Sequence, residues 1–330
     1  MKCIFKNKKI LIAGGTGMVG QPLTKMLHEL GAKVYVASLD KISKEQSKHI
    51  VKFYKLDLIN VSNCIKVTKN KDIVFNLLGV TGSPQINYSN PGSFMMSNLY
   101  CAVNLLYAAQ KNKVKRYLYT STYGVYGKEK SMKEDNVWKT FPSEHDKFAG
   151  WAKRMGELQV EAYQKEFKFE SIHIVRPANI YGPNLNFNPK NSMVVASLIK
   201  RVMDNENPLK VWGDGTNIRD FVYSEDVAKA MIKVMQKKIT KPINIGSGKG
   251  TSIKNLIKVI ISSKFVKSKP QIKYDKTKKS GDKKRVLNTK FAEKNGIYNK
   301  TDLSLGIDKT IDWYIKNRKK IASKFNYFQK

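Results

Sequence analysis

The chain of 330 residues is 41% hydrophobic, enough for one large or two modest cores, and its apolar runs are too short for a membrane span or a signal peptide. Its net charge of +35 could attract nucleic acid or an anionic membrane, but the lysines are spread along the whole chain without interleaved aromatic residues, so we expect neither partner. The cysteines Cys3, Cys64 and Cys101 lack metal-ligand spacing, which predicts a reduced, cytoplasmic protein without a metal site.

The first stretch of the chain predicts a strand, a turn and a helix. Residues 10–13 form a short apolar run typical of a buried parallel strand, and residues 21–30 have the spacing of an amphipathic helix. The connecting loop is Gly14, Gly15, Thr16, Gly17, Met18, Val19 and Gly20. Gly14 allows a tight turn, Gly17 lets the backbone approach a pyrophosphate, and Gly20 lets the helix pack closely. We therefore expect a dinucleotide site; the alternative is a glycine-rich turn that binds nothing.

Strands and helices then alternate, which predicts an α/β fold built on a doubly wound parallel (Rossmann) sheet. Further strands are expected at residues 34–38, 51–54, 72–78, 116–120 and 170–176, with a helix from Asn98. Ser38 ends the second strand, where an acidic residue would bind the adenosine ribose and favour NAD. Because Asp40 and Lys41 follow closely, the choice between NAD and NADP stays open.

Several motifs together resemble one enzyme family. The glycine spacing of three and three, the segment STYGVYG at 121–127, RPANIYGP at 176–183 and VWGDGT at 211–216 are all similar to the extended short-chain dehydrogenase/reductases. This branch is also called the NAD-dependent epimerase/dehydratase family, and the likeness is strongest to its GDP-fucose synthase-like, nucleotide-sugar enzymes. It extends over residues 9–314, nearly the whole chain.

The resemblance implies two lobes and a homodimer. Residues 1–180 and 221–248 would form the NAD(P)-binding Rossmann domain, and residues 181–220 and 249–330 a smaller α/β lobe for the nucleotide sugar. Besides the glycine loop, the cofactor would contact Ser38, Asp57, Leu58, Leu77, Leu78, Gly79, Asn98, Thr120, Lys153 and Pro177. For Asp57 the alternative is a helix N-cap.

The resemblance also implies the substrate-binding residues. They would be Thr122, Asn179, Asn191, Trp212, Arg219, Lys278 and Arg285. Arginine suits a diphosphate because its planar fork can bond two oxygens at once. The basic run 278–285 could equally be a solvated surface.

The expected catalytic pair is incomplete. The family pattern is a tyrosine, three residues and a lysine; Lys153 matches the lysine, but Ala149 stands where the tyrosine should be. Thr122 matches the hydroxyl residue that would bond the reacting oxygen of the sugar. The missing proton carrier could be Tyr123, Tyr126, the pair His145 and Asp146, or a water activated by lysine.

These residues predict an NAD(P)-dependent nucleotide-sugar epimerase or reductase that transfers hydride at a sugar carbon, C4 being the expected one. Gly124 and Met193 stand where fucose synthases carry their epimerising cysteine and histidine, so double epimerisation is not expected. Ala149 motivates an alternative, a regulatory protein that binds the cofactor without catalysis. Charge alone suggests a third reading, an RNA-binding relative.

Overall fold

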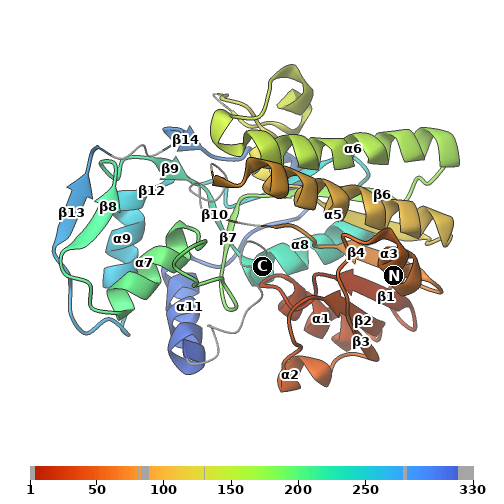
Figure 1. Cartoon of the computed structure of the whole chain (residues 1–330), viewed down its shortest axis with the longest axis horizontal. Coiled ribbons are helices and arrows are strands. Elements are labelled where there is room, and N and C mark those ends of the chain that lie inside the picture. The colour runs from red at the N-terminus through yellow and green to blue at the C-terminus, as the bar shows by residue number, and fades with distance from the viewer. Residues whose placement is uncertain (1–3, 81, 83–88, 130, 278–280, 319–330) are drawn as a thin grey trace.

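A computed structural model describes residues 4–80, 82, 89–129, 131–277 and 281–318. Seven parallel strands form one central sheet in the order β11-β6-β5-β4-β1-β2-β3 (Figure 1). They are β1 (Lys9–Ala13), β2 (Lys33–Ser38), β3 (Lys52–Lys55), β4 (Ile73–Asn76), β5 (Arg116–Thr120), β6 (Ile172–Pro177) and β11 (Ile243–Ile245). The predicted doubly wound sheet is confirmed, because the strand order reverses direction beside β1.

Helices cover both faces of this sheet. On one side lie α1 (Gly20–Glu29), the short α2 (Lys44–Ser47) and α8 (Ser224–Lys237); on the other lie α3 (Val61–Thr68), α5 (Pro91–Lys111) and α6 (Lys147–Phe167). Strand β1 shows why its sequence is apolar throughout. Ile10 and Ile12 point into the core under α1 and α8, whereas Leu11 and Ala13 point into the core under α3, α5 and α6.

A third core lies beside the sheet, at the left of Figure 1. It is built from α7 (Val194–Met203), α9 (Ile253–Ile261), α11 (Leu303–Asn317) and the parallel pair β8 (Leu209–Trp212) and β13 (Ile272–Asp275). Small sheets join the lobes: β7 (Asn179–Tyr181) with β10 (Phe221–Tyr223), and β9 (Ile218–Arg219) with β12 (Thr251–Ser252) and β14 (Lys284–Arg285). This lobe is the one that the sequence assigns to the nucleotide sugar.

One segment of the expected substrate lobe returns to the sheet. Leu287, Ala292 of α10 (Lys290–Lys294) and Ile297 are buried in the core beside α1 and α8. The 3-10 helices η1 (Tyr123–Val125), η2 (Glu134–Lys139) and η3 (Glu144–Asp146) lie between β5 and α6. The returning segment therefore brings β14 close to the stretch that follows β5.

Membrane-spanning and metal-binding features are absent from the described part of the chain. None of its helices is long and apolar enough to cross a bilayer. No group of three or more His, Cys, Asp or Glu side chains in those residues could hold a metal ion. Cys64 and Cys101 are buried free thiols.

Candidate active site

A cavity of about 540 Å³ opens at the carboxyl ends of the central strands, where ligands bind in open α/β sheets. Its walls are the loops that follow β1 to β6, together with the first turns of α6 and part of the segment 184–195. It brings together most of the predicted residues. They are Gly14, Thr16, Gly17, Met18, Val19, Gly20, Ser38, Asp57, Leu58, Leu77, Leu78, Gly79, Asn98, Thr120, Thr122, Tyr123, Lys153, Pro177, Asn179 and Asn191.

Some predicted residues lie elsewhere. Within the described chain, those that do not line the cavity are Gly15, His145, Trp212, Arg219 and Arg285. Trp212 is 55% exposed on β8, and His145 belongs to η3, next to Gly281. Lys278 lies outside the described residues. The resemblance alone predicted that Trp212, Arg219 and Arg285 contact the substrate, and no local sequence pattern fixes where their side chains lie.

The glycine loop forms a cradle that larger side chains would fill. Gly14 has φ +79°, and a Cβ added there would lie 3.1 Å from the Leu77 carbonyl oxygen. A Cβ on Gly20 would lie 2.5 Å from the Gly15 Cα, so this glycine permits close contact between the start of α1 and the loop. The N-terminus of α1 faces the cavity, since Gly17, Val19 and Gly20 line it. Because free amides and the helix dipole attract anions, the residues present fit the diphosphate of a dinucleotide.

Asp57, Asp40 and Ser38 lie at the end of the cavity where the adenosine of the cofactor is expected. Asp57 does not cap α3, since Asn60 is the N-cap and its side chain accepts from the Ser62 amide. Asp57 instead accepts from the Ile59 amide at 3.0 Å and lines the cavity. Asp40 also lines it, while the Ser38 and Thr16 hydroxyls are hydrogen-bonded to each other. Asp40 and Asp57 thus place two carboxylates at this end of the cavity, and the choice between NAD and NADP stays open.

Lys153 is fixed between the ends of two strands. Its Nζ donates to the carbonyl oxygens of Leu78, at 2.8 Å, and Thr120, at 3.0 Å. It also lies next to Gly79, where a Cβ would come within 3.4 Å of it. Burial lowers the pKa of Lys153 to about 8, although the nearby Cys101 and Glu157 act in the opposite direction. The ammonium group is therefore costly to hold here, as expected where a charge serves binding or catalysis.

Thr122 and Tyr123 follow β5 at the floor of the cavity. The Thr122 hydroxyl oxygen accepts from the Gly124 amide at 3.1 Å, which leaves its proton able to donate into the cavity. The Tyr123 hydroxyl donates to Asn179 Oδ1 at 2.9 Å, and Asn179 in turn donates to the Asp220 carbonyl oxygen. Burial raises the pKa of Tyr123, so its hydroxyl holds its proton firmly.

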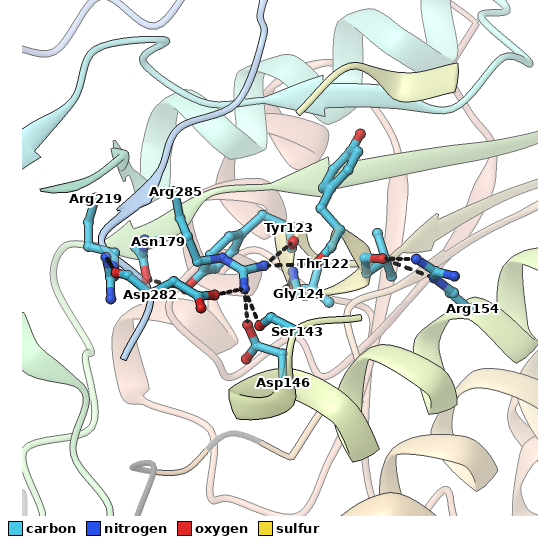
Figure 2. Close-up of polar contacts among 12 residues, drawn as sticks. Thr122, Tyr123, Gly124, Ser143, Asp146, Arg154, Asn179, Arg219, Asp282 and Arg285 are labelled. Carbon is cyan, nitrogen blue, oxygen red and sulfur yellow. Dashed lines mark hydrogen bonds and ion pairs between the residues drawn. The ribbon is translucent and has the colours of Figure 1, made fainter. Parts of the chain in front are cut away.

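Arg285 is a buried centre of ion pairs and not a surface residue (Figure 2). Its guanidinium is paired with Asp146 at 3.1 Å and Asp282 at 2.9 Å, and it donates to the Ser143 hydroxyl and the Tyr123 carbonyl oxygen. These partners engage Nη1 and Nη2 of the guanidinium, while Nε is buried without a hydrogen-bond partner among the described residues. The structure thus gives Arg285 an internal role, tying β14 to the segment between β5 and α6, where the sequence predicted a contact with phosphate.

Comparison with known proteins agrees with this geometry. Residues 10–246 match the NAD dependent epimerase/dehydratase family. The chain is 27% identical to the GDP-L-fucose synthase of Escherichia coli (strain K12) over 95% of this chain and 98% of that protein. It is 25% identical to the GDP-L-colitose synthase of Yersinia pseudotuberculosis over 94% of this chain and 99% of that one.

Solved structures are similar over almost their whole length. The UDP-glucose 4-epimerase of Thermotoga maritima, solved with UDP-glucose, superposes with a TM-score of 0.81 at 26% identity, covering 94% of this chain and 99% of that one. Two more distant structures share the fold: a Thermus thermophilus UDP-glucose 4-epimerase in complex with NAD (22% identity, TM-score 0.79, covering 93% and 99%) and a Naegleria fowleri GDP-L-fucose synthetase bound to NADP (21%, 0.80, covering 96% and 95%). Neighbours of this fold therefore bind either dinucleotide.

Proposed function

Because the chain belongs to the NAD dependent epimerase/dehydratase family, we propose that it is an enzyme that binds NAD or NADP and transfers hydride at a carbon of a nucleotide sugar, which we assign to C4. One observation carries this proposal: the glycine cradle, Lys153 and Thr122 all line a single cavity. A GDP-sugar is the first candidate, since GDP-L-fucose and GDP-L-colitose synthases are among the relatives. A reduced, cytoplasmic location fits the buried free thiols.

The residues of the cavity suggest separate tasks. The cofactor, when bound, supplies the hydride acceptor or donor, and its diphosphate would lie against the amides of the glycine loop. Lys153, whose Nζ is bonded to the Leu78 and Thr120 carbonyl oxygens, would hold the nicotinamide ribose. Thr122 would donate to the reacting oxygen of the sugar, and Asn179 and Asn191 would contact the rest of the sugar nucleotide.

A substrate panel tests the proposal. The protein is incubated with NADH or NADPH and GDP-, UDP-, dTDP- and CDP-4-keto sugars, and with NAD⁺ or NADP⁺ and the matching hexoses. Nicotinamide absorbance and product identity are recorded. We expect turnover of at least one sugar nucleotide. Tight cofactor binding without turnover across the panel would contradict the enzyme proposal and favour the regulatory alternative.

We further propose a homodimer formed through α5 and α6. These helices pack against each other along one face of the sheet and carry large apolar side chains at the surface: Tyr100 and Tyr107, each 40% exposed, and Leu158, 45% exposed. Exposed apolar clusters of this kind are typical of protein interfaces.

The double variant Tyr107→Glu/Leu158→Glu is expected to elute as a monomer in size-exclusion chromatography with light scattering, because two charges per subunit would be buried at the contact. Leu305→Glu is the matched control, since Leu305 is 51% exposed on α11, away from these helices. A wild-type protein that is monomeric, or a double variant that stays dimeric, would contradict the proposed interface.

A further inference from the structure

We propose that the carboxylate of Asp146 is the proton carrier of this site, in the role for which Ala149 offers no titratable group. The inference depends on the function proposed above, because it assigns the proton that accompanies hydride transfer at the sugar. It adds a residue for which the family pattern of tyrosine and lysine has no counterpart.

Asp146 lies at the right place relative to Thr122. It is the N-cap of α6, three residues and thus about one turn before Ala149, and both residues line the cavity. A Cβ added to Gly124 would lie 3.4 Å from the Asp146 carboxyl carbon and 3.3 Å from the Thr122 methyl carbon. The carboxylate and the Thr122 side chain therefore flank the same small space (Figure 2).

The start of α6 is held firmly against this region. A Cβ on Gly150 would lie 2.6 Å from the Gly124 carbonyl oxygen, so glycine permits close contact there. Arg154 donates to the Val125 carbonyl oxygen from Nε at 2.9 Å and from Nη2 at 2.7 Å, as Figure 2 shows. These contacts fix the distance between Asp146 and the Thr122 segment before any ligand binds.

The other candidates are engaged or lie elsewhere. Tyr123 donates its proton to Asn179, and the buried Tyr126 donates to Asn244 Oδ1 at 2.7 Å. His145 is not among the described residues that line the cavity. The other lining carboxylates of the described chain, Asp40 and Asp57, follow β2 and β3, at the end of the cavity assigned to adenosine. Asp146 is thus the lining carboxylate of the described chain that lies beside the Thr122 segment.

The charges around Asp146 let it gain and lose a proton. Arg285 and Arg219 face it as cations, Asp282 as an anion, and His145 adjoins it on η3. Burial raises the pKa of Asp146, and the cation of Arg285 only partly offsets this. For Asp282 burial acts in the same direction, but hydrogen bonding and charge from Arg285 outweigh it and lower the pKa. Asp282 therefore remains ionised as the counter-ion of Arg285 while Asp146 titrates.

The proton step balances in both directions. When the sugar alcohol is oxidised, its O–H bond breaks, the proton bonds to an Asp146 carboxylate oxygen, and the freed pair forms the C=O bond. The C–H pair leaves as hydride to the oxidised nicotinamide cofactor proposed above. When a ketone is reduced, the Asp146 carboxyl O–H bond breaks and its proton goes to the former carbonyl oxygen. No further oxidant or reductant is needed.

The test compares Asp146→Asn with Asp282→Asn. The second variant is the matched control, because Asp282 also forms an ion pair with the Arg285 guanidinium. With NADH or NADPH and the sugar nucleotide turned over by the wild type, Asp146→Asn should lower kcat by about 10²- to 10⁴-fold. Its NADH affinity, measured by fluorescence titration, and its thermal melting should stay near wild type. Asp282→Asn should lose less than about tenfold. In Asp146→Ala, added formate should restore part of the lost rate, which a purely structural role would not allow.

A second readout needs no turnover. Infrared difference spectra of the cofactor-free wild type against Asp146→Asn should show a carboxyl band that titrates at higher pH than the band lost in Asp282→Asn. Asp146→Asn with more than about a tenth of wild-type kcat, or equal losses in both variants without rescue by formate, would overturn the proposal. An Asp146 band that titrates at or below that of Asp282 would also overturn it. A wild type inactive on the whole panel would instead overturn the proposed function.

Discussion

Lys153→Met is expected to lower kcat/KM for sugar-nucleotide turnover by about 10³-fold or more, and to weaken NADH binding as well. The reason is that Nζ lies between the Leu78 and Thr120 carbonyl oxygens and next to Gly79, where the proposed function places the nicotinamide ribose. Methionine fills a similar volume but provides no donor. Steady-state kinetics and fluorescence titration measure the two effects, and Lys133→Met, a substitution of an exposed lysine between β5 and α6, is the control. A Lys153 variant with wild-type NADH affinity would contradict the proposed contact.

The same variant should reveal a pH dependence of stability. Burial lowers the pKa of Lys153 to about 8 in the folded protein, whereas the unfolded chain keeps the ordinary value of about 10.4. Between these values the unfolded state binds more protons, so the free energy of unfolding rises with pH. Between pH 7 and 9 the wild type should therefore gain about 1 kcal/mol relative to Lys153→Met. Denaturant unfolding at both pH values measures this difference. A difference that shrinks or reverses with rising pH would place the Lys153 pKa above its ordinary value.

The parts of the fold that sequence predicts well are those with a local cause. The apolar run of β1 meets a core on each side, and in the loop after it Gly14 serves a turn and Gly20 a close contact of the helix. The helix expected from Asn98 begins at Pro91, and most expected strand ends shift by one or two residues. For example, Lys168 takes a left-handed conformation that ends α6, so that β6 begins at Ile172 and not at the expected Glu170. Periodicity contains no signal for such a cap.

The site is predicted less completely because the charged side chains that pair within it come from segments far apart in the sequence. Arg285 donates to Ser143, 142 positions earlier in the chain. Asp282, three residues before Arg285, forms an ion pair with the same guanidinium. A basic run read alone indicates phosphate binding, but the return of residues 281–297 to the sheet turns Arg285 inward and leaves Lys283 and Lys284 exposed. The position of Asp146, one turn before Ala149, was visible in the sequence. What sequence could not provide is the space beside Gly124 that the carboxylate shares with Thr122.

Arg176→Met is expected to lower the free energy of unfolding by about 3–5 kcal/mol. Arg176 Nη2 and Nε bond the Glu157 carboxylate at 2.6 and 3.0 Å, and both side chains are almost fully buried. Glu157 also accepts from the Ser121 hydroxyl at 2.5 Å. Removing the guanidinium leaves a buried carboxylate without its cation, and such a charge costs far more than the pair itself contributes.

Two comparisons distinguish this cause from simple loss of packing. Glu157→Met/Arg176→Met removes both charges and should recover most of the lost stability, because apolar pairs of similar volume often replace buried ion pairs at little cost. Lys241→Met breaks the exposed pair with Asp135, at 2.8 Å, and should cost less than about 1 kcal/mol. Since Ser121 adjoins Thr122, the double variant should be stable yet slower in turnover than the wild type. A double variant no more stable than Arg176→Met would show that volume, and not the unpaired charge, sets the loss.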